Sequence, residues 1–323
     1  MTQKRILITG AAGFIGQLLA HRLLNHEDGG YSLILTDVIE PTIPKNVKWP
    51  GNARVVVADL STEASKVVDH ALDAVYIFHG IMSSGAEFNF DLGMKVNFEA
   101  TKILLETLRK SCPGVRVIYA SSGAIYGGKV QQPIRETTRP TPESSYGAEK
   151  LMCESLINDY TRRGFVDGLI LRFPTISVRP GKPTAAASSF LSGIIREPMN
   201  HEECVIPVED RSFRHWLCSP RILVQNLEFS LTLQLDLLPG YDRAVNHPGI
   251  GVSIQDMMDS LARVGGQDKI SYLREQADPK LEPILYSWPT DYDNTKALGL
   301  GFKRDVFFDD IVQDYRNSLE DPI

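Results

Sequence analysis

The stretch of sequence that decides the fold is Arg5-Ile6-Leu7-Ile8-Thr9-Gly10-Ala11-Ala12-Gly13-Phe14-Ile15-Gly16. Residues 5–9 are apolar and rich in β-branched side chains, which predicts a buried strand. Beyond Gly16, leucines recur at helical spacing, at positions 18, 19, 23 and 24. A strand, a glycine-rich turn and a helix in this order form the context that a dinucleotide-binding fingerprint requires.

Each glycine of this turn has its own task in such a fingerprint. Gly10 allows the tight turn, Gly13 lets the backbone approach a pyrophosphate, and Gly16 lets the helix pack closely on the strand. The helix begins at Phe14 and Ile15, where backbone N–H groups and the positive end of the helix dipole face the phosphates. The turn therefore predicts a bound dinucleotide.

The choice of dinucleotide is indicated by Asp37, which ends a second expected strand, residues 32–36, about 20 residues beyond the glycines. A carboxylate there binds the ribose hydroxyls and repels a 2′-phosphate, and Val38-Ile39-Glu40 supplies no cation to offset that repulsion. The sequence therefore favours NAD over NADP. The alternative is an ordinary solvated aspartate at a strand end.

Asp59 and Leu60 follow a third apolar run, residues 54–58, at the place where such folds contact adenine. An aspartate at a strand end also caps helices, so a structural cap is the alternative for Asp59. Both residues are expected to contact the cofactor.

Strands and helices are expected to alternate as far as residue 173, which predicts an α/β protein with a doubly wound parallel sheet, the Rossmann fold. Beyond the runs already named, the expected strands are residues 74–78, 115–119 and 168–173, and the expected helices are residues 87–111 and 145–163. After Pro174 the alternation is lost and prolines punctuate shorter elements. A smaller C-terminal substrate-binding lid is expected there.

The expected domains follow from this change. Residues 1–175, with a return segment at about 217–248, form the NAD-binding domain, and residues 176–216 and 249–323 form the lid. Residues 272–289 are rich in proline and charge and are expected to be irregular surface. The last residues of the lid, 306–319, have the pattern of an amphipathic helix.

The composition is that of a soluble globular protein, with 43% hydrophobic and 23% charged residues. A formal net charge of −6 offers no basic field for nucleic acid or an anionic membrane. No stretch approaches the roughly 20 apolar residues of a membrane span, and no leader peptide is expected. The four scattered cysteines fit a reduced, cytoplasmic protein without a metal site, whose partner is a small-molecule substrate.

Chemistry is indicated by Tyr146 and Lys150, in the run Ser144-Ser145-Tyr146-Gly147-Ala148-Glu149-Lys150. Residues four apart share one helix face, so these side chains are expected to be neighbours. The ammonium favours the phenolate form of the tyrosine. Such a phenolate can take a proton from an alcohol while hydride leaves the same carbon. Chance occurrence of so short a pattern is the alternative.

Three ordered motifs resemble the extended short-chain dehydrogenase/reductase superfamily, in its NAD-dependent epimerase/dehydratase group. They are the glycine turn, the strand end Tyr119-Ala120-Ser121-Ser122-Gly123-Ala124-Ile125-Tyr126-Gly127, and the pair of Tyr146 and Lys150. The resemblance implies that Ser122 binds the reacting oxygen and that Tyr146 is the acid/base. It also implies that Lys150 assists the tyrosine and holds the nicotinamide ribose.

The same resemblance implies further contacts to NAD, by Gly80 after the fourth expected strand and by Pro174 after the sixth. Asn97 resembles the asparagine that anchors a helix and a proton-relay water in the family. A plain helix asparagine is the alternative for it. His79 does not align with the family histidine and is expected to be packed rather than catalytic.

Departures from the family pattern narrow the reaction. Dehydratases acting on nucleotide sugars need an acidic pair directly after the catalytic hydroxyl, where this chain has Gly123 and Ala124, so dehydration is excluded. Nucleotide-sugar epimerases carry an asparagine that holds the diphosphate, and the corresponding run here is Phe173-Pro174-Thr175. An epimerase with tightly bound NAD and a non-enzymatic NAD sensor stay as alternatives.

Within the superfamily, the stretches 90–97, 159–168, 172–183 and 185–190 resemble D-erythronate dehydrogenase. That family oxidises C2 of a four-carbon sugar acid with NAD. The resemblance therefore implies oxidation of a D-erythronate-like tetronate to the 2-oxo acid.

A sugar-acid substrate needs a cation for its carboxylate and hydroxyl partners for its alcohols. Arg179, just past the sixth expected strand, is the best candidate for the cation, and a structural arginine is the alternative. Lys182 and Arg214 are reserves. The loops expected at the mouth of the site carry small hydroxyls at Ser83, Ser84, Thr175 and Ser188.

The superfamily resemblance also implies a homodimer, in which residues 87–111 and 145–163 pack as a four-helix bundle between subunits. Apolar positions wider than one core-facing stripe give modest support. They are Val96, Ala100, Ile103, Leu104 and Leu108 in the first helix, and Leu151, Met152, Cys153, Leu156 and Ile157 in the second. The alternative is that both faces are buried within one subunit.

Overall fold

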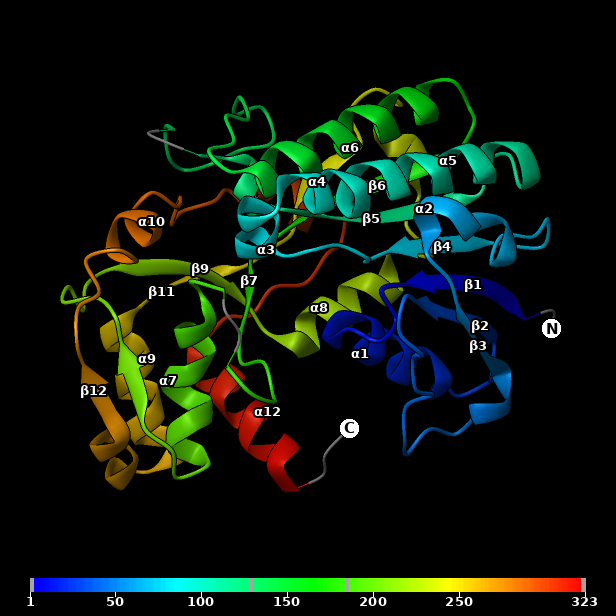
Figure 1. Ribbon diagram of the computed structural model, residues 1–323. Coiled ribbons are helices and arrows are strands. Elements are labelled where there is room, and N and C mark those ends of the chain that lie inside the picture. The colour runs from blue at the N-terminus through cyan, green and yellow to red at the C-terminus, as the bar shows by residue number, and fades with distance from the viewer. Residues whose placement is uncertain (1–2, 128–129, 184–185, 321–323) are drawn as a thin grey trace.

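The computed structural model describes residues 3–127, 130–183 and 186–320, and its centre is a seven-stranded sheet (Figure 1). Residue 185, the first of the stretch 185–190, lies outside the described residues. All neighbouring strands of this sheet are parallel, in the order β10-β6-β5-β4-β1-β2-β3. The strands are β1 (Lys4–Thr9), β2 (Tyr31–Asp37), β3 (Ala53–Val57), β4 (Ala74–Ile77), β5 (Arg116–Ser122), β6 (Asp167–Phe173) and β10 (Ala244–Asn246).

Helices cover both faces of this sheet, as a doubly wound fold requires. In Figure 1, α5 (Ala100–Ser111) and α6 (Ser145–Arg162) lie above the sheet, and α1 (Phe14–Leu24) and α8 (Pro220–Phe229) lie below it. Strand β1 serves two cores, because Ile6 and Ile8 pack with α1 and α8 while Leu7 packs with α5 and α6. Burial on both sides explains why the strands are continuously apolar. The doubly wound parallel sheet is therefore confirmed.

The expected helix at residues 87–111 is wrong as a single helix. The chain forms α3 (Ser83–Phe88), α4 (Phe90–Gly93), a π-helical turn (Met94–Glu99) and then α5. The break falls at Asn89, whose backbone is not helical and whose side chain accepts a hydrogen bond from the N–H of Leu92, 3.1 Å away. An asparagine that caps the next helix in this way ends the previous one. The helix expected at 145–163 is confirmed as α6.

Several apolar residues that pointed to a dimer are buried inside the subunit. Ala100, Leu104 and Leu108 of α5, with Cys153 and Ile157 of α6, belong to the core between these helices and the sheet. The alternative of burial within one subunit therefore holds for these residues, and they give no support for a dimer.

A second region, at the left and bottom of Figure 1, has its own core and two small sheets. One sheet has the order β11-β9-β7 and the other pairs β12 with β8. The strands are β7 (Thr175–Ile176), β8 (Cys204–Ile206), β9 (Arg214–Cys218), β11 (Ile250–Ser253) and β12 (Leu273–Glu275). The main helices are α7 (Ser189–Met199), α9 (Ile254–Ser260) and α12 (Phe308–Glu320).

Residues 272–289 are not wholly irregular, which corrects the expectation for them. They contain β12, which pairs with β8, and the short helix α10 (Glu282–Tyr286). The pairing partner lies about 70 residues away, so local composition did not indicate it. Helix α12 confirms the amphipathic pattern of residues 306–319, since Phe308, Ile311, Val312 and Tyr315 are buried.

Short helices among the remaining elements include α2 (Leu60–Glu63) after β3, the 3₁₀ turn Gly123–Ile125 after β5, and α11 (Thr295–Gly299). Within the described parts of the chain, no helix has the length and apolar character that crossing a bilayer would need.

Candidate functional site

The glycine turn lies at the carboxyl ends of the strands, between β1 and α1. Gly10 has a φ of +64°, and a Cβ on it would lie 2.7 Å from the backbone nitrogen of His79. A Cβ on Gly16 would lie 2.6 Å from the carbonyl oxygen of Gly10. Only glycine fits either position, because real Cβ atoms are not found within 3.0 Å of such backbone atoms.

The start of α1 is suited to a phosphate. Gly13 is the N-cap, no side chain caps the helix, and its first turn, at Phe14 and Ile15, holds no acidic residue. The first N–H groups of the helix are therefore left for an anion, as in dinucleotide-binding folds. The cradle in this chain fits the pyrophosphate of NAD.

Asp37 lies beside the same turn. Its carboxylate accepts hydrogen bonds from the backbone N–H groups of Ala12, at 3.1 Å, and Val38, at 2.7 Å. This places a negative charge next to the glycines, where the ribose of a bound dinucleotide would lie.

Asp59 acts as a helix cap in this structure. Its side chain accepts from the backbone N–H and the hydroxyl of Ser61, and lies 3.3 Å from Nζ of Lys95. These contacts, chiefly the hydrogen bond from the Ser61 hydroxyl, hold the pKa of Asp59 below its usual value. The side chain of Leu60 is buried in the core, so only its backbone can reach a ligand. The cap is present, and the adenine contact stays a prediction.

Ser122 ends β5, and Tyr146 and Lys150 lie on α6, which packs against this end of the strand. Ser122 is the last residue of β5, and its Oγ accepts from the N–H of Ala124 at 3.1 Å. Lys150 is buried, and its Nζ donates to the carbonyl of Ala120 at 2.8 Å. The same ammonium lies 5.5 Å from the ring centre of Tyr146. The two side chains of α6 are therefore neighbours, as their spacing predicts.

The loop after β4 connects this group to the glycine turn. Asn97 is buried, and its side chain exchanges hydrogen bonds with both backbone groups of Ile81 and donates to Glu149 at 2.6 Å. A Cβ on Gly80 would lie 2.8 Å from Oδ1 of Asn97 and 3.8 Å from Nζ of Lys150. Asn97 therefore fixes this loop against α6, and its role in anchoring a proton-relay water stays a prediction.

Half-buried His79 is bonded on both ring nitrogens, with Nδ1 2.9 Å from Oγ1 of Thr9 and Nε2 3.2 Å from Oγ1 of Thr101. Burial lowers its pKa to about 3, so the ring is neutral at working pH. The structure thus places His79 in packing rather than in chemistry.

The strand register brings the next residues to the same place. Ser122 pairs with Phe173, so Pro174 and Thr175 follow β6 directly beside the end of β5. The hydroxyl of Thr175 lies 2.9 Å from Nε2 of His215 on β9. Pro174 therefore lies at the carboxyl edge of the sheet, where the glycine turn also lies. The hydroxyl of Thr175 already has His215 as a polar partner.

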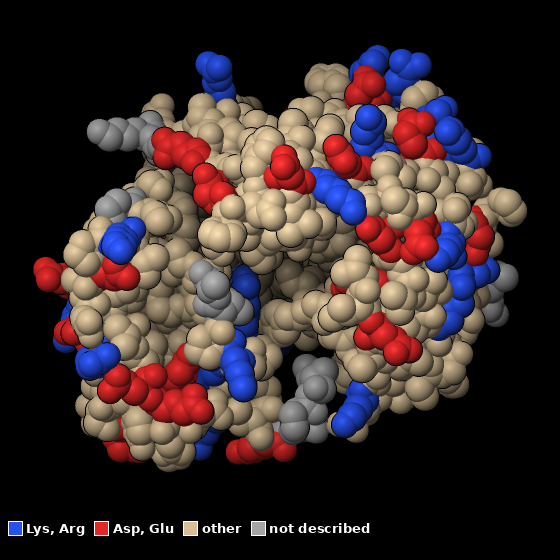
Figure 2. All heavy atoms as spheres, viewed as in Figure 1, with Lys and Arg blue, Asp and Glu red and all other residues tan. Residues whose placement is uncertain are grey.

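Arg179 is a half-buried cation. Its Nε donates to the carbonyl of Ile176 at 3.1 Å, and the described residues give it no carboxylate partner. Burial lowers its pKa and the nearby Tyr146 opposes that shift, so the guanidinium lies within electrostatic reach of the tyrosine. Figure 2 shows a hollow between the two halves of the molecule, with basic atoms at its wall. The geometry of Arg179 suits an anionic ligand.

The other substrate candidates are distributed unevenly. Ser83 is half-buried and Ser84 is exposed at the start of α3, which packs against α6. Ser188 is the half-buried N-cap residue of α7 and makes no side-chain capping bond. Lys182 is exposed, and exposed Arg214 donates to the carbonyl of Gly251. Neither reserve cation is brought to Tyr146 by a contact in the described residues.

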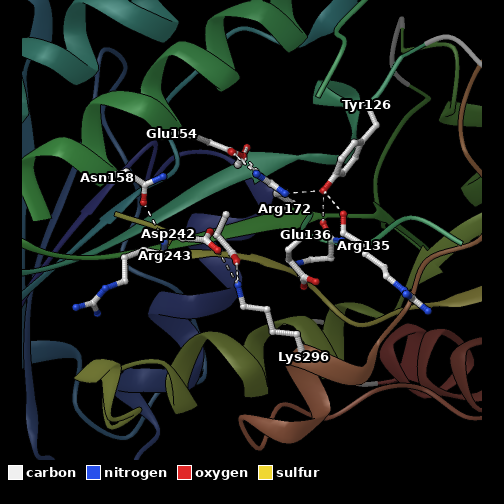
Figure 3. A network of polar contacts seen from close by, with 12 residues as sticks. Tyr126, Arg135, Glu136, Glu154, Asn158, Arg172, Asp242, Arg243 and Lys296 are labelled. Carbon is white, nitrogen blue, oxygen red and sulfur yellow. Dashed lines mark hydrogen bonds and ion pairs between the residues drawn. The ribbon is translucent and has the colours of Figure 1, made fainter. Parts of the chain in front are cut away.

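The sequence reasoning missed a buried polar network beneath the site. Arg172 of β6 and Glu154 of α6 form an ion pair of 2.7 Å whose side chains are 7% and 2% exposed (Figure 3). Ser121 donates to Glu154 at 2.5 Å, and Arg172 donates to the hydroxyl of Tyr126 at 2.5 Å. The network ties α6 to β5 and β6 next to Ser122. Its only sequence signal was Glu154, one helical turn beyond Lys150.

The matching family model is described as the NAD dependent epimerase/dehydratase family and covers residues 6–218. The chain is 42% identical to D-erythronate dehydrogenase from Haemophilus influenzae over 96% of its own length and 98% of the relative's. It is also 42% identical to D-erythronate dehydrogenase from Cupriavidus necator, over 96% and 97%. Among solved structures, a nucleoside-diphosphate-sugar epimerase from Agrobacterium tumefaciens matches with a TM-score of 0.91 and 34% identity, over 100% of this chain and 95% of that one.

These similarities agree with the glycine turn at the uncapped start of α1 and with the dehydrogenase motifs at the end of β5 and on α6. The chain therefore belongs to the NAD dependent epimerase/dehydratase family and, within it, is an NAD-dependent dehydrogenase.

Proposed function

We propose that the protein oxidises a small sugar acid, a D-erythronate-like tetronate, at C2 to the 2-oxo acid with NAD. The observation that carries this proposal is the 42% identity to two D-erythronate dehydrogenases over nearly the full length of all three chains. The arrangement of Ser122, Tyr146 and Lys150 supports it, because these are the groups that oxidation of an alcohol needs.

In this proposal the Lys150 ammonium favours the phenolate form of Tyr146. The phenolate takes the proton of the C2 hydroxyl and becomes a neutral phenol. The Ser122 hydroxyl binds the reacting oxygen and orients it toward Tyr146. Bound NAD supplies the acceptor for the hydride that leaves C2.

The cofactor contacts that we propose are distributed along the carboxyl edge of the sheet. They are Gly10, Gly13, Phe14, Ile15, Gly16, Asp37, Asp59, Leu60, Gly80, Asn97, Tyr146, Lys150 and Pro174. The Asp37 carboxylate beside the glycine turn supports the preference for NAD over NADP.

For the substrate, we propose that Arg179 pairs with the carboxylate, because it is a half-buried cation to which the described residues offer no carboxylate. Ser83, Ser84, Ser188 and Thr175 supply polar contacts from the surrounding loops, and Thr175 does so while bonded to His215. Residues 1–175 with 217–248 would bind NAD, and residues 176–216 and 249–323 would form the substrate-binding lid.

A nucleotide-sugar epimerase with tightly bound NAD is the second candidate, favoured by the similarity to the Agrobacterium tumefaciens structure. The position of the diphosphate-holding asparagine is occupied by Thr175, whose hydroxyl is engaged by His215. An epimerase would retain its cofactor through purification and form no net NADH.

The experiment that separates these candidates measures NADH at 340 nm with a panel of C3 to C6 aldonic acids, alongside nucleotide sugars. We expect NADH formation with D-erythronate or a close tetronate. Turnover of none of the sugar acids would contradict the proposal. Isomerisation of a nucleotide sugar without NADH would establish the second candidate.

We further propose that the protein is a cytoplasmic homodimer. Large apolar side chains are exposed near the start of the expected bundle, on α3, α4 and α6: Phe88 (95% exposed), Phe90 (59%), Leu92 (43%) and Met152 (37%). These helices contact one another, and large apolar side chains exposed on neighbouring elements are typical of a protein interface. Light scattering at micromolar concentration should give twice the 35.9 kDa mass of one chain, and the single-chain mass would refute the dimer.

A further inference from the structure

The side chain of Tyr292 is held firmly at the boundary between the two halves of the molecule. Its backbone lies beside Ile134, where the N–H of Ile134 donates to Asp291 and the N–H of Asp293 donates back to Ile134, at 2.9 Å and 2.8 Å. Its ring stacks on Trp216 of β9 at 5.3 Å and meets the ring of Tyr126 edge-on at 6.0 Å. Two aromatic neighbours therefore leave the phenol little freedom to turn.

The Tyr292 hydroxyl fills the space beside Gly123. A Cβ on Gly123 would lie only 2.8 Å from this oxygen, closer than real Cβ contacts come. The backbone at Gly123 does not demand glycine, because it is not among the positive-φ residues. The demand comes from the tyrosine hydroxyl instead. Since Gly123 directly follows Ser122, this hydroxyl lies next to the proposed reacting centre.

Tyr126 shows the difference between a structural phenol and this one. Its hydroxyl contacts Arg172, Asn246 and the carbonyl of Arg135, so the protein itself satisfies it (Figure 3). The hydroxyl of Tyr292 makes no hydrogen bond to any described residue. Burial raises the pKa of Tyr292, so the group stays a neutral donor at working pH. Tyr292 is half-buried, and its hydroxyl is not one of the fully enclosed side-chain atoms that lack a partner, so a ligand can reach it and accept its hydrogen bond.

We propose that Tyr292 is a substrate-binding residue whose hydroxyl donates to a hydroxyl oxygen on the carbon chain beyond C2. This inference rests on the proposed oxidation of a sugar acid. A neutral phenol suits an alcohol, whereas the carboxylate is better served by the cation of Arg179. Gly123 then belongs to the same binding site, because its lack of a side chain leaves room for the hydroxyl of Tyr292. A site built this way rejects analogues that lack the bonded hydroxyl.

The test compares Tyr292→Phe with wild type on D-erythronate and on 2-hydroxybutyrate, which has the C2 alcohol but no hydroxyl beyond it. We expect Tyr292→Phe to lower kcat/KM for D-erythronate by about 10-fold to 100-fold, mainly through KM, as for a lost hydrogen bond of 1–3 kcal/mol. It should change kcat/KM for 2-hydroxybutyrate by less than about 2-fold, and leave the KM for NAD unchanged. The control is Tyr315→Phe, which removes a lid phenol hydroxyl that contacts Asn200.

A second pair of variants tests the geometry. Gly123→Ala should impair wild type because its methyl group meets the phenol oxygen, and should cost little more once Tyr292→Phe has removed that oxygen. Equal kinetics of Tyr292→Phe and wild type on D-erythronate, or equal losses on both substrates, would overturn the proposal. Additive losses in the double variant would also overturn it. Wild type without turnover of any sugar acid would instead contradict the proposed function, and this inference with it.

Discussion

Strands β5 and β6 carry an ion pair at each end, and the two pairs have different surroundings. At the amino ends, Arg116 and Asp167 are register partners 2.7 Å apart, with side chains 19% and 34% exposed. This arginine otherwise donates to the carbonyls of Ser230 and Leu233, which secures a loop. At the carboxyl ends, the pair of Arg172 and Glu154 is buried.

The buried pair contacts elements of the proposed site. Glu154 lies on the helix of Tyr146 and Lys150, and it accepts from Ser121, the neighbour of Ser122. One end of these strands therefore maintains the sheet, while the other also holds together the elements that carry the proposed reacting groups. In open α/β sheets, ligands bind in the crevice outside the carboxyl ends of the strands.

The largest effect should come from removing the acid/base at the carboxyl end. Tyr146→Phe should lower kcat by about 10²–10⁴-fold, because a phenylalanine cannot take the proton. Its affinity for NAD, measured by titration of protein fluorescence, should be nearly unchanged. Tyr160→Phe is the control, since Tyr160 is on the same helix but contacts Glu106. Equal turnover in Tyr146→Phe and wild type would contradict the proposed acid/base role of Tyr146.

The two ion pairs can be compared directly by Glu154→Gln and Asp167→Asn. Glu154→Gln leaves a buried guanidinium without its carboxylate, which should cost about 3–5 kcal/mol of unfolding free energy. It should also lower kcat by about 10-fold or more, because small misplacements of reacting groups are costly. Asp167→Asn should cost about 1 kcal/mol or less and leave kcat within about 2-fold.

Urea unfolding and steady-state kinetics measure both effects. Should Glu154→Gln fold too poorly for kinetics, Arg172→Lys keeps the charge and loses the two-point contact, and the same lowering of kcat is expected. Equal losses of kcat in Glu154→Gln and Asp167→Asn would contradict a special role of the buried ion pair at the carboxyl ends.

Acid should destabilise the protein through two histidines at the carboxyl edge, half-buried His79 and buried His247. His79 follows β4 and His247 follows β10, and burial lowers their pKa values to about 3 and about 4 from an ordinary 6.5. Between pH 6.5 and the lowered pKa values, the unfolded chain binds protons that the folded chain does not. The free energy of unfolding therefore falls as the pH falls from about 6.5 to about 4. Each histidine contributes roughly 1.4 kcal/mol per pH unit there.

Urea unfolding at pH 7 and pH 5 measures this slope. His79→Gln should flatten it, because glutamine does not titrate. An unfolding free energy that is equal at the two pH values would show that these rings are not buried in neutral form.

A smaller effect is expected at the carboxyl end of β2. Replacing Asp37 with Ser and Val38 with Arg removes the charge that repels a 2′-phosphate and adds a cation. The ratio of kcat/KM for NADP over NAD should rise by about 10-fold or more. An unchanged ratio would mean that another residue contacts the ribose.

The sequence was sufficient for the half of the molecule where local pattern and fold agree. Residues 5–16 predicted β1, the turn and α1 because the strand, the glycines and the leucine spacing lie next to one another in the chain. The spacing of Tyr146 and Lys150 predicted their contact because a helix fixes it. The alternation of expected strands and helices likewise predicted the α/β class.

Features that depend on distant pairing were not predictable in this way. The helix break at Asn89 depends on a side-chain cap that competes with a strong helical pattern. The pairing of β12 with β8 and the contact between Arg172 and Glu154 join separate segments. Tyr292 lies about 170 residues from Gly123 and belongs to no motif, so only the assembled structure brings them together.

We propose that hydride passes from C2 of a sugar acid to NAD at the carboxyl end of β5. Deuterium at that carbon tests this transfer most directly. The protein is supplied with D-erythronate deuterated at C2 and with NAD, and both products are analysed by mass spectrometry. We predict that the deuterium appears in the reduced cofactor and that the sugar product is the unlabelled 2-oxo acid. Deuterium retained in an oxidised sugar product, or no reduced cofactor at all, would contradict it.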